Sequence, residues 1–368
     1  EPCILYGELY TKYKSEIIHK VISKTNIESS NLKRSKRNDV IIPCSGETAI
    51  DIAVARCVPF DNIILGGDLN IIRLHKDDGA FMAYQLNGKR KIDIAQLAQG
   101  VSVVHLYGEN IKAIKTYNPC LQEQQKIVKL LSMLDERIEV QNKIIEDLKK
   151  LKSAIAETLF CTPKESMPAK RVSPYNKEWK LIKLSDICQR VQTKNTGNQC
   201  RQVLTIAAQH GLVNQEDFFN KTVASENLEG YYLLQKGDFA YNKSYSGGYT
   251  WGAIKRLEWY DKGVLSPLYI CFRPDSSKVN ADFLAHYFES KKWHKGIADI
   301  AGEGARNHGL LNISVIDFFN TIHRIPDLDE QKDIARILNS LSSKLSCEQR
   351  VIQNLTMQRS YLLHKMFI

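Results

Sequence analysis

The sequence predicts a mixed α/β protein in which two similar domains are separated by two long helices that pair antiparallel as a coiled coil. Three observations predict this fold: an internal repeat, two long runs of heptad-spaced apolar residues, and short strand-like segments elsewhere. We expect a first domain at 1–120, a helix at 121–160, a hinge at 161–178, a second domain at 179–326 and a second helix at 327–368.

The internal repeat is clearest where each long helix begins. Residues 119–127 match residues 326–334 at a shift of 207, and the match continues without a gap as far as Phe160 and Phe367. Such self-similarity indicates a duplicated unit made of a domain and the helix that follows it. Between the first helix and the second domain, residues 161–178 contain three prolines, which favours a hinge.

The two domains have the pattern of short strands broken by Gly, Asn and Asp turns, with occasional helices. Their repeat is looser: 38–42 aligns with 237–241 at a shift of 199, and 110–114 aligns with 312–316 at a shift of 202. By this alignment, counterparts of about 179–202 are missing before the first residue. We therefore expect the first domain to begin upstream of the sequence given.

The long helices carry apolar residues at alternating steps of four and three, the period of a left-handed coiled coil. The central seam positions are Leu134, Ile138, Gln141, Ile145, Leu341, Leu345, Glu348 and Ile352. Polar residues interrupt both seams at matching places, Gln141 with Glu348 and Lys152 with Arg359. Because a polar core residue fixes register, we predict that the two helices pair antiparallel, with Gln141 and Glu348 near the middle. The alternative is that these positions face solvent where the seam drifts.

Composition excludes several classes of protein. The 368 residues are 43% hydrophobic with a net charge of +10, which argues against disorder, and no apolar run has the length of a membrane span. The nine cysteines lack metal-ligand spacing and no secretory signal is visible, so we expect reduced thiols and a cytoplasmic protein with no metal site. The excess positive charge, +3 over 1–120 and +6 over 161–326, favours a polyanionic partner for the domains.

Two similar domains joined by such helices fit a DNA site made of two separated parts. A helix of 40 residues spans about 60 Å at 1.5 Å per residue. A protein with two reading domains binds two half-sites at a fixed spacing. Since the two domains differ in sequence, we expect the two half-sites to differ.

Polar and basic residues gather in a few loops of both domains. A cluster of four cations at 33–37 predicts either a phosphate clamp or a solvated loop, and Glu47 in the turn that follows can accept from a cytosine amino group. In the second domain, the Gly-rich segment 242–249 and the loop 302–308 offer groups for base edges and phosphates, or ordinary turns. The predicted DNA contacts are Lys33, Arg34, Lys36, Arg37, Ser45, Gly46, Glu47, Thr48, Asn242, Lys243, Ser244, Tyr245, Tyr249, Arg306, Asn307 and His308.

The duplicated helix start, Pro-x-Leu-x-Glu-Gln-x-x-Ile, resembles that of the specificity subunits of type I restriction–modification systems. The segments 6–13, 45–48 and 179–187 also resemble target-recognition domains of that family. The resemblance covers essentially the whole chain. It implies a non-catalytic subunit in which each domain reads one half of a split, asymmetric site in double-stranded DNA.

The resemblance also implies which partners the chain has. The helices would set the gap between half-sites and dock two adenine-N6 methyltransferase subunits, and restriction (translocase) subunits would complete the nuclease. S-adenosylmethionine, ATP and Mg²⁺ would then bind to the partner subunits, and this chain would hold no cofactor. No membrane partner is expected.

Catalytic alternatives find little support in the sequence. Asp275 with Glu289 and Lys291 imitates a nuclease signature, but the apolar residues before Glu289 have helical spacing, whereas that chemistry needs a strand. The Asn118-Pro119 pair lacks the second proline and the aromatic residue of an amino-methyltransferase motif, and no Walker A sequence occurs. The remaining rivals are a stand-alone DNA-binding regulator and a coiled-coil interaction scaffold.

Overall fold

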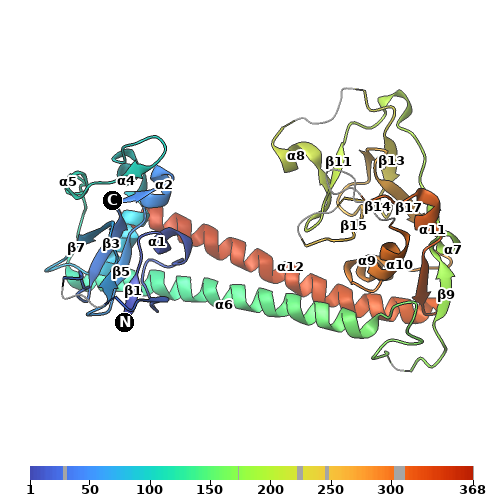
Figure 1. The fold of residues 1–368 in the computed structure, drawn as a ribbon, viewed down its shortest axis with the longest axis horizontal. Helices are drawn as coiled ribbons and strands as arrows, with labels where there is room; N and C mark the ends of the chain where they lie inside the picture. Colours follow the sequence, from blue (N-terminus) through green and yellow to red (C-terminus); the bar gives the residue numbers. More distant parts are fainter. Residues whose placement is uncertain (28–30, 173, 222–226, 245–247, 302–310, 368) are drawn as a thin grey trace. The chain divides into compact units, whose positions relative to one another are not determined.

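The computed structural model describes residues 1–27, 31–172, 174–221, 227–244, 248–301 and 311–367. The chain divides into two compact units (Figure 1). The first unit comprises Glu1–Ile145 with Cys347–Ile368, and the second comprises Glu146–Ser346. Each unit therefore contains one domain together with part of both long helices.

Among the described residues, the domain of the first unit contains three small sheets and five short helices. In one sheet β3 (Asp39–Pro43) lies between β5 (Arg56–Val58) and β7 (Leu69–Ile72), and both pairings are antiparallel. The other sheets are β2 (Ser23–Lys24), β1 (Pro2–Ile4) and β6 (Ile64–Leu65), and β4 (Ser45–Gly46) with β8 (Val104–His105). The helices are α1 (Glu8–Thr11), α2 (Ala49–Ile52), α3 (Gly79–Asn87), α4 (Lys91–Gln96) and α5 (Gly108–Ile111).

The domain of the second unit is built around a four-stranded antiparallel sheet. Its strands are, in order, β10 (Cys188–Arg190), β17 (Ile270–Pro274), β14 (Phe239–Asn242) and β15 (Ala253–Arg256). Antiparallel pairs join β11 (Leu204–Ala207) to β12 (Gly211–Asn214), β13 (Tyr232–Gln235) to β16 (Lys262–Leu265) and β9 (Lys180–Lys183) to β18 (Ile322–Ile325). The helices are α7 (Leu184–Ile187), η1 (Thr196–Asn198), α8 (Gln215–Phe219), α9 (Ala281–Glu289), α10 (His294–Ile300) and α11 (Val315–Phe319).

The predicted repeat is visible in matching ion pairs at one strand of each central sheet. The first residue of β3, Asp39, accepts from Arg73 at 2.9 and 2.8 Å, and Asp238, just before β14, accepts from Arg273 at 2.6 and 2.8 Å. Each aspartate is only 1% exposed. Since a buried carboxylate needs a well-aligned partner, the same device stabilises the same strand in both domains.

A second matching contact fastens each long helix to its own domain. Gln124 and Gln331, the glutamines of the duplicated helix start, are each 1% exposed. Their Nε2 atoms donate to the carbonyl of the proline five residues earlier, at 2.8 Å in both units. Their Oε1 atoms accept from the backbone N–H of Asp78 (2.8 Å) and Asn280 (2.7 Å), the N-cap residues of α3 and α9. The repeated motif is thus a joint between helix and domain.

The two long helices are α6 (Leu121–Leu159) and α12 (Leu328–Lys365), which confirms the predicted helical pair. Every seam residue named above is buried or half-buried. In the first unit Gln141 Nε2 donates to Glu348 Oε2 at 2.5 Å. There Leu131 packs with Leu363, so the chain directions are opposite and the pair is antiparallel. The prediction of an antiparallel pair with Gln141 and Glu348 near its middle agrees with this contact.

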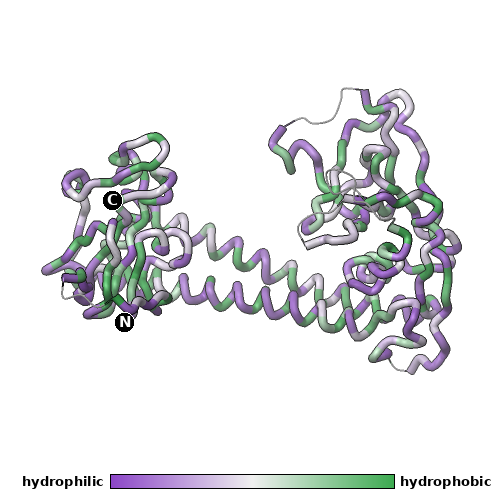
Figure 2. The backbone as a smooth tube through the Cα atoms, viewed as in Figure 1, coloured by the Kyte–Doolittle hydropathy of each residue, from purple (hydrophilic) through white to green (hydrophobic). Residues whose placement is uncertain are grey.

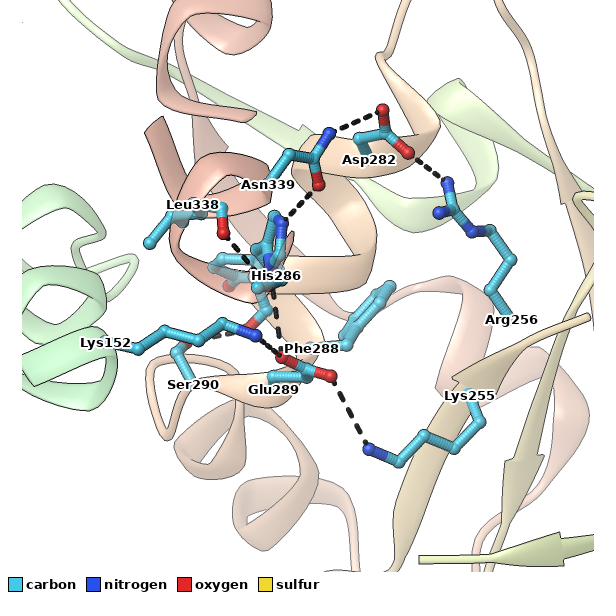
Figure 3. Close-up of polar contacts among 12 residues, drawn as sticks. Lys152, Lys255, Arg256, Asp282, His286, Phe288, Glu289, Ser290, Leu338 and Asn339 are labelled. Carbon is cyan, nitrogen blue, oxygen red and sulfur yellow. Dashed lines mark hydrogen bonds and ion pairs between the residues drawn. The ribbon is translucent and has the colours of Figure 1, made fainter. Parts of the chain in front are cut away.

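The other matched pair of polar seam residues is Lys152 and Arg359. Each binds a carboxylate of its own unit's domain. Lys152 Nζ lies 2.9 Å from Glu289 Oε2 at the end of α9 (Figure 3). Arg359 binds Glu16 of the first domain and Asp135 of α6. Both positions are polar, as the sequence shows, and the carboxylates that they bind belong to residues outside the named seam.

Candidate nucleic-acid interface

The basic cluster at 33–37 is an exposed loop before β3. Ser35 is buried and holds the loop in place, since its hydroxyl donates to the Phe60 carbonyl at 2.7 Å. Arg34 is paired with Glu1 at 2.7 Å, which reduces its value as a phosphate ligand. Lys33, Lys36 and Arg37 are exposed, and within the described ranges no ion pair involves them. These three cations remain available for a polyanion.

The turn at 45–48 presents fewer free groups than the sequence suggested. Ser45 is buried and its hydroxyl donates to Asp68, while Thr48 caps α2 by accepting from Asp51 N at 3.2 Å. At Gly46 a side chain would meet Ile52, because an added Cβ would lie 2.5 Å from the Ile52 Cγ2. Glu47 is therefore the exposed functional group of this turn.

Two aromatic residues beside this turn were missed by the sequence reasoning. β4 pairs with β8 so that Ser45 lies opposite His105. The rings of His105 and Tyr107 stack with centroids 6.3 Å apart and an angle of 21°, and both side chains are exposed. The signal was present in the repeat, since at the shift of 202 His105 aligns with Asn307. Exposed stacked rings beside a carboxylate can contact bases.

In the segment 242–249 of the second unit, several of the described side chains form hydrogen bonds within their own domain. Tyr249 packs against the core, and its hydroxyl donates to the Ala208 carbonyl at 3.0 Å. Lys243 Nζ donates to the Ile313 carbonyl at 3.2 Å, and Asn242 Oδ1 accepts from Ser244 N at 3.1 Å. The side chains of Lys243 and Tyr249 therefore bind backbone carbonyls elsewhere in the second domain.

Four predicted contacts of the second domain, Tyr245, Arg306, Asn307 and His308, lie outside the described residues. The described neighbours of these loops do meet, because Leu311 N donates to the Lys243 carbonyl at 2.8 Å. In the first unit the corresponding backbone bond runs from Leu106 N to the Cys44 carbonyl at 2.7 Å. Both domains thus bring the same two stretches of chain together.

A cleft of about 380 Å³ lies beside this segment in the second unit. Its lining includes Gln209, Tyr249, Lys255, Glu289, Lys291 and His294. Burial lowers the pKa of His294, and the charge of Lys291 lowers it further, so this ring is neutral at pH 7. The cleft therefore combines ammonium groups, a neutral imidazole and an amide, which bind phosphates and base edges, with the Glu289 carboxylate, which repels phosphates and can accept from base amino groups.

Glu289 forms ion pairs with Lys152 and Lys255 in this region (Figure 3). Burial raises the pKa of its carboxyl, but the nearby His286, whose Nδ1 lies 3.8 Å from Oε2, and the charges of Lys152 and Lys255 outweigh burial and leave the pKa well below its usual range. Glu289 lies at the end of helix α9 rather than on a strand. This geometry does not match the nuclease signature, and no group of three His, Cys, Asp or Glu residues suited to a metal occurs in the part of the chain that the structure describes.

Comparison with known proteins identifies the family. Residues 5–150 and 176–357 match the type I restriction modification DNA specificity domain. The chain belongs to this family. The two matched stretches contain the two domains and most of both long helices, so this specificity family accounts for the duplication. No helix among the described residues is long and apolar enough to cross a membrane.

Individual members of the specificity family resemble the chain over most of its length. The type I restriction enzyme MjaVIII specificity subunit of Methanocaldococcus jannaschii is 23% identical, over 94% of this chain and 81% of that protein. The crystal structure of the type I restriction–modification S subunit from M. genitalium has a TM-score of 0.58 and 19% identity, covering 100% of this chain and 92% of that one. A chain from a structural study of type I complex assembly has a TM-score of 0.50 and 16% identity, over 91% of this chain and 83% of that one. These structures support the fold.

Proposed function

We propose that the chain is the DNA-reading subunit of a type I restriction–modification complex, with each domain reading one half of a split, asymmetric site. The observation that carries this proposal is the duplication. The two domains share the aspartate–arginine pair and the glutamine joint, yet they differ in the groups they expose. Equal frameworks with unequal surfaces suit two half-sites of different sequence.

The proposed DNA contacts fall into two kinds. In the first unit Lys33, Lys36 and Arg37 would bind phosphates, while Glu47 and the His105–Tyr107 stack would contact bases. In the second unit the cleft beside Tyr249 would supply the contacts, together with the nearby loops that the sequence singled out. Phosphate contacts fix position and base contacts give specificity, so binding should weaken with salt and differ between sequences.

The long helices would join this subunit to its catalytic partners. Leu130, Met133, Val140 and Ile144 of α6 are exposed and follow a heptad pattern. Such a face suits a further helix, and we assign it to an adenine-N6 methyltransferase subunit. The chain itself would be non-catalytic, so S-adenosylmethionine, ATP and Mg²⁺ would bind to the methyltransferase and restriction subunits. The number of residues in the helices would set the gap between half-sites.

Methylation mapping tests the proposal directly. The chain would be expressed with the methyltransferase subunit of its own system, and N6-methyladenine would be mapped across the host DNA. We expect a split motif with two unlike halves that disappears when this chain is omitted. Methylation of a continuous motif, or methylation that does not require the chain, would contradict it. Tight site-specific DNA binding without any complex with the methyltransferase would favour the stand-alone regulator.

A variant of the first unit shows which half-site it reads. His105→Ala with Tyr107→Ala removes the exposed stack and leaves the second unit untouched. We expect relaxed or lost methylation at one half of the motif and an unchanged second half. Exposed Tyr361→Ala on α12 is a matched control, because it removes an exposed ring of a long helix.

A further inference from the structure

A chain of three charges connects α6 to the cleft of the second unit. The carboxylate of Glu289 lies between two ammonium groups (Figure 3). Lys152 Nζ of α6 is 2.9 Å from Oε2, and Lys255 Nζ of β15 is 3.8 Å from Oε1. All three residues belong to the second unit. The cation closer to the carboxylate is therefore the one on the long helix.

The three charges differ in the surface that they reach. Lys255 and Glu289 line the cleft beside Tyr249, whereas Lys152 is not among the described residues that line it. Lys152 instead occupies a polar position of the α6 seam, and hydrophobic residues recur along this helix between hydrophilic ones (Figure 2). Lys152 can thus influence the cleft through Glu289, the residue that contacts both.

The charge of Lys255 can attract a phosphate only while Glu289 leaves it free. A carboxylate that pairs closely with an ammonium group cancels much of its attraction for another anion. The 2.9 Å contact of Glu289 with Lys152 has the length of a charge-assisted hydrogen bond, whereas the 3.8 Å contact with Lys255 is too long for one. By binding the carboxylate more closely, Lys152 keeps it from pairing fully with Lys255.

The first unit carries a buried arginine at the matching place. Arg56 of β5 and Lys255 of β15 each lie opposite the residue two positions after the matched aspartate of their own domain, so they occupy the same place in the two sheets. Arg56 is 7% exposed, and its guanidinium donates to the carbonyls of Leu9 and Tyr13 at 3.1 and 2.9 Å. Its hydrogen bonds hold it inside the domain. Of these two matched cations, only Lys255 therefore faces a cleft.

We propose that Lys152 is a positioning residue for DNA binding by the second domain: it holds Glu289 away from Lys255 and so leaves the Lys255 ammonium group free to bind a DNA phosphate in the cleft. This inference rests on the proposed function, since it takes DNA as the occupant of the cleft. It adds that a residue of the long helix sets the affinity of a recognition domain. Without Lys152, Glu289 pairs with Lys255 and one phosphate contact is lost.

Fluorescence anisotropy of the full chain with a labelled DNA duplex of mixed sequence, over a salt series, tests the inference. Lys152→Met should weaken binding roughly five- to tenfold at about 0.1 M salt and reduce the slope of log affinity against log salt by about 0.9, the effect of one lost phosphate contact. Lys149→Met is the matched control, because it removes an exposed lysine three residues earlier on the same helix. Equal effects of the two variants would overturn the inference and leave the proposed function intact. A wild-type chain without salt-dependent DNA binding would contradict both.

A second substitution separates positioning by Lys152 from a direct contact with DNA. When Glu289→Gln is added to Lys152→Met, no carboxylate is left to pair with Lys255, so affinity and salt slope should return at least to the wild-type values. Lys255→Met should lose the same contact, and Lys152→Met added to it should have no further effect. Binding that Glu289→Gln fails to restore, or that Lys255→Met leaves unchanged, would refute the assignment. Hydrogen exchange of α9 checks that the second unit stays folded in each variant.

Discussion

In both units a cation on a long helix binds a carboxylate of the domain and so fastens the helix to it. The two cations occupy matched positions of the repeat, but the carboxylates that they bind differ. In the first unit Arg359 binds Glu16, from the loop after α1, and Asp135 of α6. In the second unit Lys152 binds Glu289 at the end of α9, which Lys255 also approaches at 3.8 Å. The repeat therefore preserves the helix position and the sign of its charge, while the domain supplies its partner from a different element.

The two anchors also differ in burial, which predicts unequal contributions to stability. Glu16 and Asp135 are 6 and 13% exposed, whereas Glu289 is 44% exposed and has a second cation nearby. Burial opposes the charge of Arg359, but its two carboxylates outweigh burial and raise its pKa. Removal of a cation is most costly where the remaining carboxylates are buried and form no other ion pair.

The largest expected effect is the loss of the first anchor. Arg359→Met leaves two largely buried carboxylates without their cation and should destabilise the first unit by about 3 kcal/mol. Lys152→Met in the second unit is the matched variant and should cost about 1 kcal/mol or less, because Glu289 is partly solvated and keeps Lys255. Hydrogen exchange read separately for each unit measures both. Equal losses would show that the difference in burial does not govern the anchors.

The next largest expected effect is a loss of stability of the second unit in acid. His323 in the second unit is fully buried between Tyr287 and Thr321, and burial lowers its pKa from 6.5 to about 4. Between these values the unfolded chain binds a proton that the folded chain excludes, so stability falls as the pH falls. The second unit should lose up to about 3 kcal/mol between pH 6.5 and 4.

The control for this acid response is a second histidine variant. His323→Asn should remove its own share of the slope and leave the part that comes from His294, whose pKa is also lowered by burial, whereas exposed His105→Asn in the first unit should leave the slope of the second unit unchanged. Unfolding followed by hydrogen exchange across this pH range gives the slope for each unit. An unchanged slope in His323→Asn would assign it to other groups. Glu289 adds to the slope only at the acid end of this window, because its lowered pKa keeps the folded carboxyl ionised while the unfolded carboxyl begins to bind a proton near its ordinary pKa of 4.5.

The glutamine joints should contribute similar free energies of unfolding to the two units, because their contacts match. Gln124→Ala and Gln331→Ala each leave a buried carbonyl and a helix N-cap N–H without a partner. We expect each variant to destabilise its own unit by about 1–3 kcal/mol, with similar values for the two. The measurement is again exchange protection of α3 and α9. A large difference would mean that the two joints are equal in geometry but not in energy.

The smallest expected effect on stability comes from the exposed cations of the first unit. Ala at Lys33, Lys36 and Arg37 should change folding stability little, because these residues lie on the surface and form no ion pair among the described residues. Each replacement should instead weaken binding to any DNA sequence and reduce the slope of log affinity against log salt by about 0.9. Arg34→Ala is the comparison, and its pairing with Glu1 predicts a smaller change. Fluorescence anisotropy over a salt series provides the slopes.

The long helices, their pairing and the duplication could all be predicted from the sequence. Heptad spacing is a local property, and each seam residue follows from its neighbours three and four positions away. The position of Gln141 and Glu348 near the middle of the pair could be predicted because both lie on regular helices whose register fixes the position of every residue. The looser repeat of the domains, at a shift of 199, made the correspondence of β3 and β14 visible through Asp39 and Asp238.

Which polar groups are free could be seen only once the folded structure was known. Ser45 donates to Asp68, Tyr249 to Ala208, and Arg359 binds Glu16, and in each case the partner is many residues away in the sequence. His105 and Tyr107 became candidates because β8 pairs with β4, which no local pattern specified. A hydroxyl or a charge looks the same in sequence whether it is exposed or engaged. Its availability depends on long-range packing, which decides whether water or another residue satisfies it.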